Sequence, residues 1–176
     1  MKKLLVAALV GVSMLTAVGC KAEEKEVHEV GINVNEKAEE KEESAEATSV
    51  DAAALASSLA KDISYTDQIA EVDLDTAKMF LNIADVDIVE SYIYESSGAT
   101  AEEVVVLVCK DSDSAAKAKT AFEQRVEEQT ENFTDYVPEE VPKLKDAVII
   151  TSKEYAVLSV SGDASKAKDI IEGAFK

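Results

Sequence analysis

The sequence predicts an α+β fold in which helices pack on an antiparallel sheet of four strands. Within residues 50–176, the spacing of apolar residues changes from the three-and-four pattern of helices to the alternation of strands. Two predicted hairpins are each followed by a helix, which gives the element order ααββαββα. Residues 104–108 are apolar at every position, which is typical of a strand buried on both faces.

The first half of this domain is predicted to contain two helices and one hairpin. Asp51 is expected to cap the first helix, whose apolar residues recur at helical spacing. A short second helix is expected over residues 75–82. Alternating side chains predict a strand over residues 86–94. The turn sequence Ser-Ser-Gly-Ala at residues 96–99 follows, and residues 103–109 return as the partner strand.

The second half is predicted to contain a third helix, a second hairpin and a final helix. The third helix is expected to be capped by Ser112 or Asp113. Its buried stripe is expected to consist of Ala115, Ala118, Phe122 and Val126, with Phe133 beyond them. A loop with two prolines follows, and residues 147–151 and 155–160 then form the hairpin. The final helix is expected to begin near Ala164.

The all-apolar strand at residues 104–108 requires cover on both of its faces. Either the N-terminal helices cover the second face of the sheet, or a partner protein does. We favour the N-terminal helices because this arrangement requires no second chain.

The N-terminus predicts a secretory signal of the bacterial lipoprotein type. Lys2 and Lys3 precede an uncharged run and a stretch of small residues that ends at residue 19. Cys20 follows directly, where lipoproteins are cleaved and acylated. We therefore expect residues 1–19 to be a signal peptide and Cys20 to be the lipidated N-terminus. Two fatty-acyl chains of the palmitate type are enough for stable anchoring in a membrane.

Two other interpretations of this segment stay open. An uncleaved anchor is one, although residues 4–19 supply only sixteen uncharged residues and a spanning helix needs about 20. An ordinary signal peptide is the other, because Ala17 occupies a position where lipoprotein signals usually carry leucine.

The segment after Cys20 is expected to be a disordered acidic tether, covering residues 20–49. Residues 21–49 contain ten glutamates and four lysines but few large apolar side chains, so they cannot offset the entropy of ordering. Fully extended, such a segment reaches on the order of 100 Å. A spacer that lifts the domain (residues 50–176) off the membrane and a merely tolerated tail both fit.

The charge of the chain excludes some partners. Removing residues 1–19 takes away two of the 18 basic residues and none of the 36 acidic ones, which leaves a net charge of −20. Nucleic acid phosphates and anionic lipid surfaces would both repel such a domain, so we expect no nucleic-acid partner.

No catalytic or metal-binding motif is evident, and we expect no cofactor. The only histidine is His28, in the tether, and Cys109 ends the apolar strand, so it is expected to be a core residue. Three Asp-x-Asp pairs lack the further ligands of a calcium loop, and two of them precede predicted helices. We interpret them as helix caps: Asp73/Asp75, Asp85/Asp87 and Asp111/Asp113.

Three segments of the domain carry a family pattern. They are Tyr92-x-Tyr94-x-Ser96-Ser97-Gly98-Ala99, then Ala101-Glu102-Glu103, then Arg125-x-x-x-Gln129-x-x-x-Phe133-x-x-Tyr136-x-Pro138-Glu139. In this pattern, residues 74–176 resemble the bacterial lipoprotein family catalogued as domain of unknown function 4358. The family's second hairpin usually turns through a Gly-Asn-Tyr-like triplet, where this chain has Lys153-Glu154-Tyr155. The resemblance implies a lipid-anchored extracytoplasmic domain and no known activity.

Arg125 and Tyr136 are the candidate site residues. Arg125 is the only arginine of the chain, and a guanidinium pairs with carboxylates in a planar two-bonded geometry that lysine cannot reproduce. Arg125 either binds a partner's carboxylate or a ligand anion, or clamps its helix to the acidic loop around Tyr136, Glu139 and Glu140. We favour the clamp, because Arg125 and this loop belong to one segment of the family pattern.

These observations favour a non-enzymatic binding or accessory domain at the outer face of the cell membrane. Its partners would be the membrane, through the lipid, and an envelope protein or a small ligand. A solute receptor for a transporter and an envelope enzyme are the alternatives. Exposed tyrosines at residues 92, 94 or 136 would favour the binding domain, whereas a deep pocket with converging polar groups would favour the alternatives.

Overall fold

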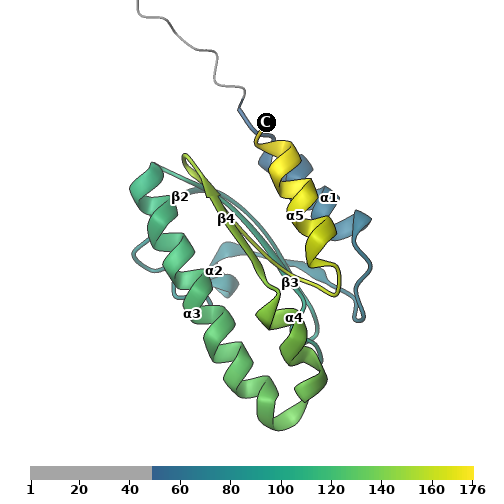
Figure 1. The fold of residues 1–176 in the computed structure, drawn as a ribbon. Coiled ribbons are helices and arrows are strands. Elements are labelled where there is room, and N and C mark those ends of the chain that lie inside the picture. Colours follow the sequence, from purple (N-terminus) through teal and green to yellow (C-terminus); the bar gives the residue numbers. More distant parts are fainter. Residues whose placement is uncertain (1–48) are drawn as a thin grey trace, which may run out of the picture. The chain divides into compact units, whose positions relative to one another are not determined.

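The computed structural model describes residues 49–176, which form an antiparallel sheet with helices on both faces (Figure 1). The predictions for the signal peptide, for lipidation of Cys20 and for the tether lie outside the described residues, apart from Ser49. Five strands are present: β1 (Ala70–Val72), β2 (Ile88–Glu95), β3 (Glu103–Cys109), β4 (Val148–Ser152) and β5 (Tyr155–Val160). They are arranged in the order β1-β2-β3-β5-β4, which places β3 at the centre.

Five α-helices connect and flank these strands. They are α1 (Ala52–Asp62), α2 (Leu74–Ala77), α3 (Ser112–Tyr136), α4 (Val141–Lys145) and α5 (Ala164–Ala174). A 3-10 turn, η1 (Pro138–Glu140), joins α3 to α4. The α+β class and the two hairpins β2–β3 and β4–β5 agree with the prediction.

The predicted strand count was wrong, and so was the predicted element order. The sheet has five strands, because Ala70–Val72 pairs with the end of β2 as an edge strand. Three residues are too few for alternation to be recognised, and β1 is stabilised by its partner strand rather than by its own sequence. The proline loop is also partly helical, since Pro138 begins η1 and Pro142 lies in the first turn of α4. Proline fits the first turn of a helix because its missing N–H has no partner there.

Aspartate side chains cap four of the helices. Asp51 accepts from the backbone N–H of Ala54, which confirms the predicted cap of α1. The cap of α3 is Asp111 rather than Ser112 or Asp113. The remaining two capping residues are Asp73 and Asp163. The predicted second helix is shorter than expected, because α2 ends at Ala77 and the chain continues in turns.

Strand β3 divides the hydrophobic core into two clusters, one on each face of the sheet. Val105 and Leu107 face the cluster that contains α3, while Val104 and Val106 face the cluster that contains α1 and α5. All four side chains are fully buried, as expected for a strand that is covered on both faces. The favoured prediction for the second face is confirmed for α1, which is joined there by α5, whereas α2 packs on the α3 face (Figure 1).

The hairpin between β4 and β5 turns through Lys153 and Glu154. Lys153 has a φ of 52°, in the left-handed region. A glycine, which the family usually has in this turn, adopts that conformation without steric cost. The two strands pair without interruption from Ser152↔Tyr155 to Val148↔Ser159.

Candidate functional site

Two buried carboxylates lie where the central strand β3 begins: Glu102 directly precedes the strand, and Glu103 is its first residue. Their side chains point to opposite faces of the sheet. Glu102 and Glu103 are each 1% exposed. Because successive side chains of an extended chain alternate, Glu103 shares the α3 face with Val105, and Glu102 shares the other face with Val104. A buried carboxylate requires a charged or hydrogen-bonding partner, so each of these residues organises a polar network.

Arg125 pairs with carboxylates of the sheet. Its Nε and Nη2 atoms both donate to Oε2 of Glu103, at 3.2 Å each, and Nη2 lies 3.6 Å from Oε1 of Glu95. The guanidinium also lies over the ring of Phe80, 4.8 Å from its centroid. Arg125 therefore ties α3 to β2 and β3. The expected partners in the loop were wrong, because Glu140 pairs with a lysine instead.

Gln129 extends this network along α3. With its amide oxygen facing Arg125, that oxygen accepts from Nη1 at 3.1 Å and from Nη2 at 2.7 Å. We assign this orientation because it satisfies both side chains. It leaves the NH₂ group of Gln129 as a donor on the side away from the guanidinium.

Glu95 and Glu103 form a pair of carboxyl groups beneath Arg125. Burial, followed by the negative charge of Glu103, raises the pKa of Glu95 to about 9, although the positive charge of Arg125 opposes this shift. The Oε1 atoms of both glutamates are buried, and neither has a hydrogen-bond partner outside the carboxyl pair among the described residues. Glu95 therefore holds a proton near neutral pH, and Glu103 is the carboxyl group that accepts both hydrogen bonds from Arg125.

The raised pKa of Glu95 predicts a pH-dependent stability. Between about pH 4.5 and 9 the folded protein binds this proton and the unfolded chain does not, so stability falls as the pH rises. We expect the free energy of unfolding to fall by of the order of 1 kcal/mol per pH unit in this range. Urea denaturation of the wild type and Glu95→Gln at several pH values measures it. Glu95→Gln should make the free energy of unfolding less dependent on pH, whereas Glu71→Gln, at an exposed position, should leave its pH dependence unchanged. The same pH dependence in all three proteins would contradict the raised pKa of Glu95.

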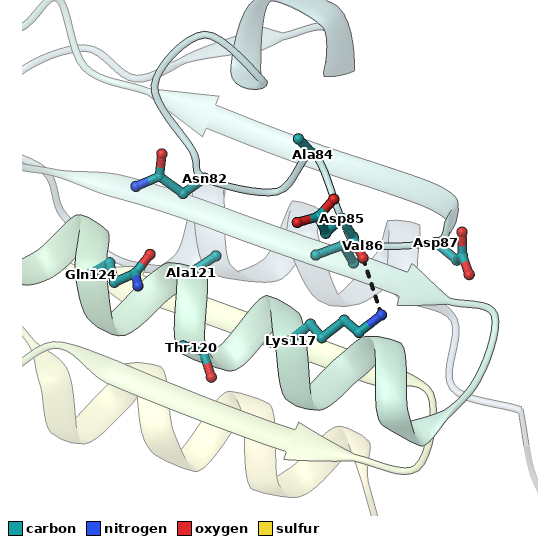
Figure 2. A pocket seen from close by; sticks show the side chains of 9 residues that line it. All are labelled: Asn82, Ala84, Asp85, Val86, Asp87, Lys117, Thr120, Ala121 and Gln124. Carbon is teal, nitrogen blue, oxygen red and sulfur yellow. Dashed lines mark hydrogen bonds between the residues drawn. The ribbon is translucent and has the colours of Figure 1, made fainter. Parts of the chain in front are cut away.

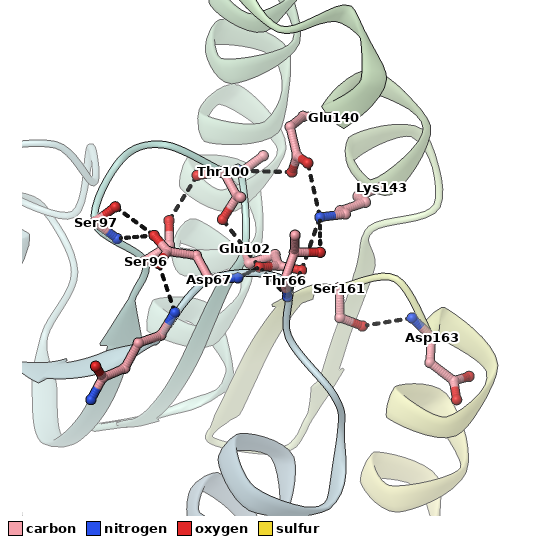
Figure 3. Close-up of polar contacts among 12 residues, drawn as sticks. Thr66, Asp67, Ser96, Ser97, Thr100, Glu102, Glu140, Lys143, Ser161 and Asp163 are labelled. Carbon is pink, nitrogen blue, oxygen red and sulfur yellow. Dashed lines mark hydrogen bonds and ion pairs between the residues drawn. The ribbon is translucent and has the colours of Figure 1, made fainter.

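The second network joins three segments around Lys143 (Figure 3). The ammonium group donates to Oε1 of Glu102 and to Oε1 of Glu140, at 2.9 Å each, and to the hydroxyl of Thr66 at 3.0 Å. Glu102 also accepts from the backbone N–H groups of Thr66 and Asp67. Glu140 accepts from the N–H of Ala101 at 3.0 Å. This network fixes the segment between α1 and β1, the start of β3 and the start of α4.

A small cavity lies beside the C-terminal half of α3 and is open to solvent. Its volume is about 250 Å³, and we name it the Tyr136 cavity. It is lined by Gly98, Gln129, Asn132, Phe133, Tyr136 and Val137. Tyr136 is 86% exposed, whereas Tyr92 and Tyr94 are half-buried. Gly98, with a φ of 90°, brings the turn between β2 and β3 to this cavity without a side chain.

The Tyr136 cavity is lined by residues from separate segments of the family pattern. Gly98 comes from its first segment, and Gln129, Phe133 and Tyr136 come from its third. Arg125 reaches the same cavity indirectly, through the amide of Gln129. The structure thus connects the two site residues expected from the sequence. The sequence analysis missed the role of Glu103 and Glu95, although Glu103 belongs to the family pattern.

A larger depression of about 690 Å³ lies between the segment before β2 and the first half of α3 (Figure 2). Asn82, Asp85, Lys117 and Gln124 contribute polar groups to its lining, and Lys117 Nζ lies 3.4 Å from the carbonyl oxygen of Asp85. None of its lining residues belongs to the family pattern. We therefore take the smaller cavity as the candidate site.

The described residues contain few groups suited to nucleophilic or metal chemistry. Cys109 is 2% exposed, and burial raises the pKa of its thiol to about 11, so the prediction of a core residue is confirmed. Within residues 49–176, no group of three or more His, Cys, Asp or Glu side chains is placed to hold a metal ion. No helix in this range has the length and apolar character needed to cross a membrane.

Comparison with known proteins gave one match. No curated protein and no solved structure matched the chain. A family model matched residues 61–161, which include Glu102, Glu103, Arg125 and Tyr136 and make up more than half of the 176 residues. The chain therefore belongs to the family described as Domain of unknown function (DUF4358).

Proposed function

We propose that this protein is a lipid-anchored extracytoplasmic binding domain, which contacts an envelope protein through the Tyr136 cavity and its surroundings. The observation that carries the proposal is the exposed aromatic ring of Tyr136, 86% accessible, at the edge of a cavity built from residues of the family pattern. Tyrosine is enriched among residues that dominate binding energy, because it combines a large apolar area with a hydroxyl group.

The N-terminal sequence supports the anchored location. Cys20 follows a signal-like segment, and the many like charges between it and the domain favour an extended spacer over a compact one. A strongly acidic domain is repelled by anionic lipids, so the spacer would hold the Tyr136 cavity away from the membrane surface. A partner in the envelope would meet the domain there.

Neither the Tyr136 cavity nor the depression of about 690 Å³ has the form that the two alternatives require. A solute receptor or an enzyme requires a cavity in which polar groups converge on an enclosed ligand. The Tyr136 cavity and the larger depression are both open to solvent. The carboxyl pair of Glu95 and Glu103 lines neither of them.

The expected result of Tyr136→Ala is a loss of partner binding without a loss of stability. The side chain is exposed, so its removal should change the free energy of unfolding by less than about 0.5 kcal/mol. Chemical crosslinking in intact cells, followed by identification of crosslinked proteins, measures partner binding. Met79→Ala is the matched control, because Met79 is 84% exposed and does not line the cavity.

Cys20→Ala tests the location in the same cells. The variant should leave the membrane fraction and lose partners that depend on anchoring. Retention of Cys20→Ala in the membrane would contradict lipid anchoring, and an unchanged set of partners in Tyr136→Ala would contradict the assigned surface.

A further inference from the structure

We propose that the partner contributes a peptide segment rich in lysine and arginine, which lies across the Tyr136 cavity with one cationic side chain over the ring of Tyr136. This inference rests on the proposed function, because it specifies the chemistry of the partner at the same surface. It is argued from the charges around the cavity and from the donors and the aromatic ring that line it.

The chain segment that supplies most of the cavity lining carries exposed charge of one sign. Between Arg125 and Lys143 the chain contains no lysine, arginine or histidine. The same stretch presents five exposed carboxylates: Glu127, Glu128, Glu131, Asp135 and Glu139. Among the ion pairs of residues 49–176, none involves any of these five.

The helix itself adds to this negative potential. The Tyr136 cavity lies at the C-terminal end of α3, where the helix dipole is negative, and the last turn of α3 carries no basic residue to offset it. Arg125 does not reverse the sign, because its charge is paired with Glu103 inside the protein. A cationic segment would be attracted to this surface, and an anionic ligand would be repelled.

The lining of the cavity favours a peptide over a small polycation. The exposed ring of Tyr136 offers a face on which a guanidinium or ammonium group can stack. Gln129 uses its amide oxygen on Arg125, so the polar group that it can offer a ligand is an NH₂ donor. A peptide backbone supplies carbonyl acceptors, whereas a protonated polyamine has none. Gly98 leaves room for a backbone to approach, because it has no side chain and open space surrounds the position of a Cβ atom there.

Two carboxylates flank the α3 residues that line the cavity: Asp135, and Glu128, whose Oε1 atom also accepts from the side chain of Asn82 at 3.3 Å. Glu128 lies four residues before Asn132 and Asp135 lies three residues after it, so both neighbour Asn132 on the surface of α3. Both are exposed, and Asn132 lines the cavity. They are the residues whose neutralisation should weaken binding most specifically.

The test uses the domain with its natural tether and a fluorescent peptide of four arginines alternating with serines, measured by fluorescence anisotropy. Tyr136→Ala should weaken binding about threefold, the size of one exposed cation–π contact. Glu128→Gln/Asp135→Asn should weaken it about fivefold. Asp169→Asn/Glu172→Gln removes the same charge from exposed positions on α5 and should change the affinity less than twofold.

Three outcomes would overturn the inference. Equal weakening by the two double variants would show that only the net charge matters. An unchanged affinity of Tyr136→Ala for the peptide would show that the peptide does not bind at the Tyr136 cavity. If spermine displaced the fluorescent peptide as well as an unlabelled peptide of equal total charge, the backbone carbonyl groups would have no role in binding.

A photoreactive residue in place of Asn132, introduced into the full chain in cells, separates this inference from the proposed function. A captured envelope protein whose crosslinked segment is rich in lysine or arginine supports both. Capture through a segment without basic residues would overturn the inference and leave the proposed function standing. Failure to capture any protein in a Tyr136-dependent manner would overturn the proposed function itself.

Discussion

Replacing Lys143 with methionine should lower the free energy of unfolding by about 3–5 kcal/mol, because it leaves buried carboxylates without their cation. Glu102 is 1% exposed and Glu140 is 5% exposed, and Lys143 bridges them at 2.9 Å each. Burial alone would raise the pKa of Glu102, but the backbone N–H groups of Asp67 and Thr66 and then Lys143 outweigh it, so that the pKa is lowered. The carboxylate is therefore charged at neutral pH, and it depends on these donors.

Urea denaturation at pH 7 measures this loss, with Lys145→Met as the matched control. Lys145 belongs to the same short helix and is exposed, and it forms no ion pair within residues 49–176. The Lys145→Met variant should lose less than about 0.5 kcal/mol of its free energy of unfolding. Equal stabilities of the two variants would contradict the role of Lys143 as the cation of a buried network.

The second large effect concerns Arg125. We expect Arg125→Met to lower the free energy of unfolding by about 3 kcal/mol at pH 8, and Arg125→Lys by about 2 kcal/mol. Lysine retains the charge but cannot donate to Glu103 from two nitrogens while also contacting Gln129 and the ring of Phe80.

Thermal and urea denaturation of the two variants at pH 8 provide the measurement. Lys119→Met is the control on the same helix, since its ion pair with Glu123 is largely exposed to solvent. An unchanged stability of Arg125→Lys together with weaker partner binding would contradict the internal clamp. That result would make Arg125 a ligand-binding residue instead.

Most helices and strands of the domain could be predicted because local patterns specify them. Apolar spacing located α1, α3 and α5, and alternation located both hairpins. The two failures are short elements, β1 and α4, which have three and five residues. Elements of this length carry too few positions to show a period, and they form because neighbouring segments supply hydrogen bonds and apolar contacts.

The candidate site shows the same division. Arg125 could be selected from the sequence because it is the only arginine, and Tyr136 because it belongs to the family pattern. Their surroundings could not be predicted. Glu103 lies 22 residues from Arg125 in the chain, and Glu140 lies 39 residues from the backbone N–H that it accepts. Ion-pair partners at such separations are determined by how α3 packs on the sheet, and no local sequence pattern predicts them.

The sequence by itself determined the class of the fold, the positions of its long helices and the acidic character of the chain. These properties depend on the spacing and chemistry of residues close together in the chain. Only the tertiary structure decided that Glu102 and Glu103 are both buried, each with a different cation, and that Gly98 meets Tyr136 at one cavity. The physical reason is that desolvated charges must be paired, and their partners come from whichever elements the packed core brings beside them.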